Sequence, residues 1–256
     1  MSITLNSLLF AGVLFVGMLV AQEIGLRFGR RRLKAEGESV RTGLGAIEGA
    51  VFGLMGLMIA FAFHGAASRF DARRQLVVEE ANDVGTAYLR LDLLPPAAQP
   101  KLRELFRRYL DARLEVYRRL PDIRAAREAQ AGAEGLQREI WASAVEASSD
   151  LPQATMLLLP ALNTMIDITT TRTVALQTHP PTVVFAMLGF LALACSLLAG
   201  YGMAGAPSRS VLHVLGFAAI LTVTVYVILD YEFPRVGLIR LDAADQVLSD
   251  ARHNMK

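Results

Sequence analysis

The chain has 256 residues, of which 53% are hydrophobic and 20% are charged. This composition excludes an ordinary soluble domain and also a protein that lies wholly in lipid, so the chain must serve both solvents. The 26 Lys and Arg residues nearly balance the 24 Asp and Glu residues, which leaves no basic excess for an acidic polymer, and we expect no nucleic-acid partner.

Four apolar stretches predict membrane-spanning helices. Crossing the hydrocarbon takes roughly 20 residues of helix, and the stretches near 3–22, 43–67, 182–202 and 210–229 are long enough. The first has no basic leader and no small-residue cleavage site, so we expect a retained anchor. The sequence therefore predicts an all-α integral membrane protein. Two transmembrane hairpins, 1–67 and 179–230, flank a soluble helical domain at 68–178, and a surface tail follows at 231–256.

Charge predicts which side of the membrane the soluble domain occupies. The positive-inside rule places the loop of the first hairpin in the cytoplasm and the 68–178 domain outside, while three arginines just after the second span argue mildly for the opposite orientation. The loop residues are Arg27, Arg30, Arg31, Arg32, Lys34 and Arg41, and the opposing residues are Arg69, Arg73 and Arg74.

Helical periodicity dominates the 68–178 domain. Its first apolar stripe is Val77, Ala81, Val84, Tyr88 and Leu91, which predicts that the second span continues as one helix to the prolines at 95–96. A second helix is expected from about residue 100 to 120 and a last one over 153–177. The Ala-, Gln- and Gly-containing stretch 125–135 is typical of a weaker helix or a loop, so we expect a bundle of three or four helices.

The second span carries an aromatic and aliphatic stripe with one acidic residue. The stripe residues Phe52, Met55, Ile59 and Phe63 share a helical face with Glu48. In a ring of such helices the apolar residues would form a gate that dewets, and Glu48 would favour cations. A second interpretation is that the span is merely packed, with its large residues filling space and Glu48 at the membrane surface beside Arg41.

Small residues form a ridge beside that stripe. Gly49, Gly53, Gly56, Ala60 and Ala67 recur at helical spacing, and such ridges let helices approach closely. The ridge fits contact with identical helices around a symmetry axis, or contact with the first or third span of the same chain.

A polar stripe follows on the same helix. Glu79, Asp83, Thr86 and Arg90 lie on one face, with Glu80 and Asn82 beside them. Neighbouring acids repel each other, so a cation or an arginine should offset them. We favour a salt-bridged helix interface over a hydrated cation site, with Asp167 and Arg172 as candidate partners, and leave any metal unassigned.

Enzymatic motifs are missing from the sequence. It contains no nucleophile elbow, phosphate-binding loop or zinc-protease motif, and its four histidines are scattered. We expect neither an enzyme nor a cofactor.

One long motif and three shorter ones resemble a known family. Residues 70–95, FDARRQLVVEEANDVGTAYLRLDLLP, resemble the hallmark segment of the bestrophin-like family of bacterial membrane proteins. The blocks 109–113, 162–172 and 230–241 match its later segments. This resemblance covers about 43–247 and implies a multi-pass protein of the bacterial inner membrane, remotely similar to bestrophin channels.

Bestrophins are pentameric channels, mostly for anions, whose second span lines an apolar neck. The resemblance thus implies a homopentameric ion channel with lipid, other copies of itself and small inorganic ions as partners. Its selectivity would be anionic by analogy or cationic if Glu48 faces the pore. The charge rule makes the 68–178 domain periplasmic, whereas bestrophins keep this part in the cytoplasm. An alternative is a membrane-anchored sensor or scaffold with a helical binding domain and no conductance.

Overall fold

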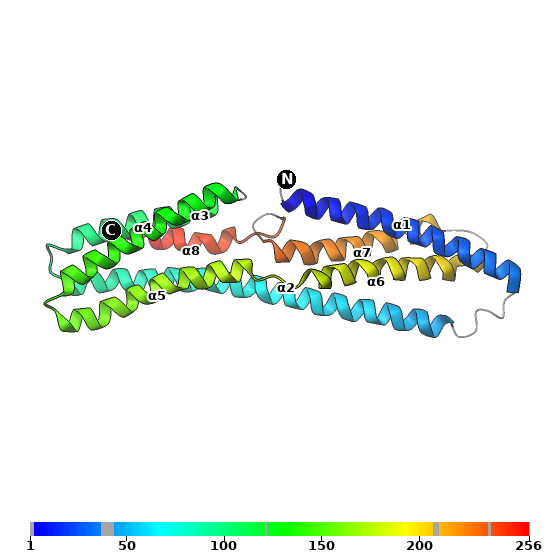
Figure 1. Ribbon diagram of the computed structural model, residues 1–256, viewed down its shortest axis with the longest axis horizontal. Coiled ribbons are helices and arrows are strands. Elements are labelled where there is room, and N and C mark those ends of the chain that lie inside the picture. The colour runs from blue at the N-terminus through cyan, green and yellow to red at the C-terminus, as the bar shows by residue number, and fades with distance from the viewer. Residues whose placement is uncertain (1–2, 37–43, 121, 207–209, 235–236, 256) are drawn as a thin grey trace. The chain divides into compact units, whose positions relative to one another are not determined.

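A computed structural model describes every residue except 1–2, 37–43, 121, 207–209, 235–236 and 256, and the described residues contain helices and no strands (Figure 1). Within the described residues four helical segments are long and apolar enough to cross a membrane: Ser7–Ala35, Gly45–Leu93, Pro152–Gly205 and Val211–Glu232. The predicted all-α membrane protein with four spans is confirmed. Arg41 lies outside the described residues.

The chain divides into two compact units. The first combines Met1–Ser68 with His179–Phe233, and the second combines Arg69–Thr178 with Pro234–Lys256. Helix α2, Leu44–Leu89, contributes its first part to one unit and its second part to the other.

Three helices run side by side in the first unit (Figure 1): α1, Ile3–Glu36; α6, Thr182–Gly202; and α7, Val211–Glu232. A buried apolar cluster joins them to α2, with Met18, Met55, Ala192 and Ala218 among its members. Buried Gln22 of α1 donates a hydrogen bond to the Val214 carbonyl of α7, 3.3 Å away. Helix α1 continues to Glu36, so Arg27 to Lys34 lie on a helix rather than in the predicted loop.

Glycines bring α1 and α6 into backbone contact. A Cβ atom added at Gly25 would lie 1.9 Å from the carbonyl oxygen of Leu197, and one at Gly200 would lie 2.0 Å from that of Gln22. Neither position has room for a side chain, which is how small residues act in membrane helix pairs. These contacts hold the first and third spans together.

The second unit is a helical bundle with an extensive apolar core. The end of α2 continues as the short 3₁₀ helix η2, Arg90–Leu93, and packs with α3, Gln99–Arg118; α4, Ile123–Ser148; and α5, Pro152–Gln177. Helix α4 is continuous, so the stretch 125–135 is helix and not loop. Asp122 caps it by accepting hydrogen bonds from the backbone N–H groups of Arg124 and Ala125.

The C-terminal segment completes this core. Helix α8, Asp242–His253, buries Ala244 and Leu248, and Met255 follows it into the core. Arg252 of α8 binds both carboxylate oxygens of Asp111 on α3 at 2.9 Å. Within 231–256, which is predicted as a surface tail, α8 therefore packs its apolar residues against the core beside α3.

Candidate functional site

The apolar part of α2 is the least enclosed of the four spans. Six per cent of the residues in its apolar window are buried, against 22% for α1, 28% for α7 and 33% for the segment that contains α6. Ile47, Leu57 and Phe61 are 60%, 52% and 65% exposed within the chain. One face of this helix is therefore left for lipid or for another protein.

The small-residue ridge lies on that exposed side. A Cβ atom added at Gly49, Gly53 or Gly56 would meet nothing within 4 Å. Ala60 is exposed as well. The ridge thus does not pack against the first or third span of its own chain, and the close approach that glycines permit is unused within a single copy.

Three of the four predicted neck residues lie on the opposite, packed side of α2, whereas Phe63 is exposed. Met55 is 3% exposed inside the apolar cluster, and Ile59 and Phe52 pack against the same cluster. The ring of Phe52 meets that of Phe217 edge to face, with centroids 6.1 Å apart. Phe63, 41% exposed, meets Tyr231 in the same way at 5.4 Å. In this packing Met55 is enclosed by its own chain and does not lie on the exposed side of α2.

Glu48 also faces its own chain. A Cβ atom added at Gly202 would lie 3.6 Å from both of its carboxylate oxygens. The carboxylate therefore lies beside the C-terminal end of α6 rather than on the exposed side of α2.

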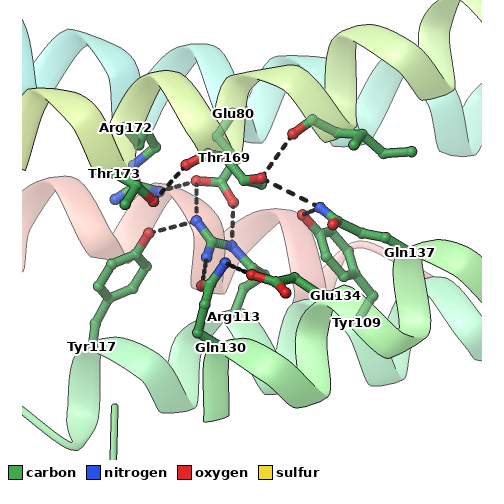
Figure 2. Close-up of polar contacts among 11 residues, drawn as sticks. Glu80, Tyr109, Arg113, Tyr117, Gln130, Glu134, Gln137, Thr169, Arg172 and Thr173 are labelled. Carbon is green, nitrogen blue, oxygen red and sulfur yellow. Dashed lines mark hydrogen bonds and ion pairs between the residues drawn. The ribbon is translucent and has the colours of Figure 1, made fainter. Parts of the chain in front are cut away.

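The second unit contains a buried ion cluster centred on Glu80. Figure 2 shows the Glu80 carboxylate between the guanidinium groups of Arg113 and Arg172. Arg113 donates from Nε and Nη2 to the two Glu80 oxygens, at 2.7 and 3.1 Å, and Arg172 donates from Nη1 to Oε2. All three side chains are buried, with exposed fractions of 0%, 2% and 4%. Three helices, α2, α3 and α5, are joined at this point.

Neutral polar groups accept further hydrogen bonds from Arg113. Arg113 donates to the hydroxyl of Tyr117 at 2.7 Å and to the amide oxygen of Gln130 at 2.6 Å. The Arg172 guanidinium lies 4.6 Å from the centre of the Tyr117 ring, a distance typical of a cation–π contact. Beside them Gln137 donates to the hydroxyl of Tyr109 at 3.2 Å (Figure 2).

The electrostatics of the cluster fix its charge state. Burial alone would raise the pKa of Glu80, but the positive charges of Arg113 and Arg172 outweigh it and hold that pKa below its ordinary value. Burial raises the pKa of Tyr109 far above its usual range, and the nearby Glu80 charge adds to this effect. The cluster therefore contains one carboxylate and two guanidinium groups, with the neutral phenol of Tyr109 beside them, at physiological pH.

The predicted polar stripe is only partly drawn together. Glu80 and Arg172 meet, whereas Glu79, Asn82, Thr86 and Asp167 are exposed. Arg90 donates to the backbone carbonyl of Leu157 on α5 rather than to an acid.

Asp83 is half-buried on α2, one helical turn after Glu80. Its Oδ2 atom is enclosed without a hydrogen-bond partner among the described residues. Burial, followed by the charges of Glu79 and Glu80, raises the pKa of Asp83. No three His, Cys, Asp or Glu side chains of the described residues converge on a common point as metal ligands would.

Arg113 is the central residue that the stripe did not reveal. It follows Phe106 by seven residues, which places it on the buried face of α3. An arginine within an apolar face needs a buried counter-charge, and this signal could have pointed to Glu80.

A family model of the bestrophin-like domain matches residues 9–244. No curated protein and no solved structure matches the chain. The matched range includes all but the first two residues of the four spans, the ion cluster and the beginning of α8, which shows that this multi-pass chain belongs to the bestrophin-like family.

Proposed function

We propose that the protein is a homo-oligomeric ion channel, pentameric as in the bestrophins that its family resembles, with α2 of each copy around the pore. The observation that carries this proposal is the exposed side of α2. An apolar helix with an unused glycine ridge fits contact with identical helices around an axis.

The packing in one chain favours a different pore surface from the predicted stripe. At 100° per residue, Leu57 lies 160° around the helix from buried Met55. Leu57 and Phe61 are more than half exposed, whereas Phe52 and Ile59 contact their own chain. We therefore propose that Leu57 and Phe61 form the apolar constriction and that the ridge Gly49, Gly53 and Gly56 contacts the next copy.

Ion preference remains a separate part of the proposal. Glu48 lies beside Gly202 of its own chain, so we do not assign it a place in the pore. Exchange of Glu48 for Gln should leave the reversal potential in a salt gradient unchanged. A shift of that potential towards the anion value would return Glu48 to the conduction path.

The proposal of an oligomer is tested by mass measurement in detergent. Wild-type protein should be a closed oligomer, and Gly53→Leu should convert it to a folded monomer because a side chain blocks close approach on the exposed ridge. Ile47→Leu, on the exposed side but off the ridge, is the matched control. Monomeric wild-type protein would remove the pore proposal.

Conductance in planar bilayers tests the constriction. Leu57→Ala and Phe61→Ala should change gating or unitary conductance, while Phe52→Ala should act mainly by loosening the contact with Phe217. Altered gating only in Phe52→Ala and Ile59→Ala would favour the originally predicted stripe.

The family match and the four spans also support placement in a bacterial inner membrane, and the basic residues of α1 favour a periplasmic second unit. Cysteine labelling from outside the cell tests this orientation. Exposed Gln153 can carry the single reactive thiol after Cys195→Ser. Gln153→Cys should react with a membrane-impermeant maleimide in intact spheroplasts, whereas reaction only after lysis would reverse the orientation.

A further inference from the structure

A cavity of about 280 Å³ opens in the second unit between the end of α3, the segment before α8, and α8 itself. Leu114, Tyr117, Arg118 and Leu120 line one side, and Arg240 and Ser249 line the other. This volume is near the lower end of the range for small-molecule sites. The size suits a compact ligand rather than a nucleotide or a peptide.

The charged groups at the cavity favour an anion. Two arginines, Arg118 and Arg240, and one aspartate, Asp245, are the charged residues that line it. Among the described residues none forms an ion pair with Arg118, although the adjacent Arg119 binds Glu115 at 2.6 Å. The Arg118 guanidinium is therefore available to bind an anion.

A second source of positive charge lies behind the Tyr117 wall. The guanidinium groups of Arg172 and Arg113 lie 4.6 and 5.4 Å from the centre of the Tyr117 ring. Together with the single carboxylate of Glu80 they leave one net positive charge in the buried ion cluster. Charge buried in a low-dielectric interior acts over a longer range than charge at the surface, so it adds to the attraction of an anion at the cavity.

The apolar lining limits the ligand further. Leu114 and Leu120 lie in the same wall as Arg118, so a bound molecule would contact hydrocarbon and guanidinium together. Inorganic phosphate or chloride would leave that apolar surface unused. We propose that this cavity binds a small organic anion, with its carboxylate or phosphate on Arg118 and Arg240 and its apolar part against the two leucines.

A ligand there would tie α8 to the bundle. It contacts α3 through Arg118 and α8 through Ser249, and α8 is otherwise held by its apolar face and by Arg252. Because the ligand binds only the docked arrangement, occupancy should stabilise the second unit by mass action. This inference does not depend on conduction.

Calorimetry on the full chain in an uncharged detergent tests the proposal with phenyl phosphate as the probe. Phenyl phosphate should bind, inorganic phosphate should bind more weakly, and benzyl alcohol, which has the ring without the charge, should not bind. Absence of phenyl phosphate binding, or equal binding of benzyl alcohol, would overturn the anion site.

Two adjacent arginines provide a matched pair of variants. Arg118→Gln should weaken phenyl phosphate binding at least about tenfold, since one charge-assisted hydrogen bond contributes this much. Arg119→Gln removes an equal charge but not a cavity residue, and should leave the affinity within about twofold. Equal loss in both variants would mean that bulk charge, not the cavity, attracts the probe.

The source of the anionic group is tested in nanodiscs. Phenyl phosphate should bind equally well in phosphatidylcholine discs and in discs with added phosphatidylglycerol. Loss of binding in the anionic discs would show that a lipid headgroup occupies the cavity and would overturn a soluble ligand. Thermal midpoints of the ligand-free variants, measured by Trp141 fluorescence, check that Arg118→Gln is folded.

Discussion

The two ends of helix α2 differ in how far the rest of the chain buries them. In the second unit its buried face meets a complete core, and Glu80, Val84 and Ala87 have no exposed surface at all. In the first unit only 6% of its apolar window is buried. In the second unit the buried face of α2 is covered by helices of the same chain. In the first unit α2 leaves an exposed face that only lipid or another copy can cover.

The ion cluster explains why α2 must be closely packed in the second unit. A buried carboxylate without counter-charges would be destabilising by several kcal/mol, and Arg113 and Arg172 supply two. The open end has no comparable constraint, since apolar residues and glycines are tolerated equally by lipid and by a neighbouring helix. The buried charge of Glu80 needs counter-charges from the same chain, whereas an apolar face can be covered by lipid or by another copy.

The largest expected effect comes from Glu80. Glu80→Ala leaves two buried guanidinium groups unpaired and should lower the free energy of unfolding of the second unit by about 3–5 kcal/mol. Glu79→Ala removes an exposed neighbour and should change it by less than about 0.5 kcal/mol. Thermal unfolding followed by Trp141, which packs against this core, measures both. Similar losses in the two variants would contradict the buried cluster.

A glycine pair tests the difference within the first unit. Gly25→Ala places a methyl group on the Leu197 carbonyl and should destabilise the α1–α6 contact by about 1–3 kcal/mol. Gly53→Ala has open space and should leave the monomer at least as stable, since Ala favours helix. Resistance to limited proteolysis in detergent compares them. An unaffected Gly25→Ala would place the two spans further apart.

Acid should destabilise the second unit by protonating Glu80 on α2. The pKa of Glu80 is lower in the folded protein than its ordinary 4.5, so its contribution to stability is present above that value. The contribution is lost as pH falls from about 4.5 through the lower folded pKa. Glu80→Gln should therefore flatten the decline in the thermal midpoint of the second unit below this pH. An unchanged slope would assign acid sensitivity to other carboxylates.

The smallest effect is expected at the α8 attachment. Arg252 and Asp111 are 30% and 56% exposed, so their coupling should be no more than about 1 kcal/mol despite two hydrogen bonds. A double-mutant cycle with Arg252→Ala and Asp111→Ala measures it through Trp141 unfolding. Coupling well above this value would make the ion pair, rather than Leu248 and its apolar neighbours, the main attachment of α8.

Much of the helical layout follows from local rules. The four spans follow from apolar length. Pro95, Pro100 and Pro181 lie at or beside helix ends because a proline inside a helix removes a hydrogen bond, although Pro160 is tolerated within α5. The stripe that includes Val77 and Val84 correctly indicated the buried face of α2 in the second unit. These properties depend on neighbours in sequence.

The orientation of side chains within the spans could not be predicted in the same way. In lipid, apolar residues cover both the packed and the open face of a helix, so periodicity does not distinguish Met55 from Leu57. The longer glycine ridge of α2 predicts a close helix contact, yet within one chain Gly25 and Gly200 make the observed close contacts. Which glycine meets which backbone depends on residues far apart in the chain.

The ion cluster was predicted in part for the same reason. Glu80 and Arg172 were both identified as members of a polar network, but an acidic stripe does not reveal which of its carboxylates is turned inwards. Arg113 lies on a different helix and closes the cluster only after α3 has packed.

The close contact between Gly25 and Leu197 also sets an order of events during synthesis. The contacting residues are separated by 172 positions (197 minus 25), which a ribosome adds in roughly 10–30 s. During that interval α1 lies in the membrane without α6, while the polypeptide of the second unit is being made. Helix α1 can therefore reach its packed position only after α6 has been made. A chain stalled before residue 182 would leave the Gly25 surface of α1 open to contact with other helices.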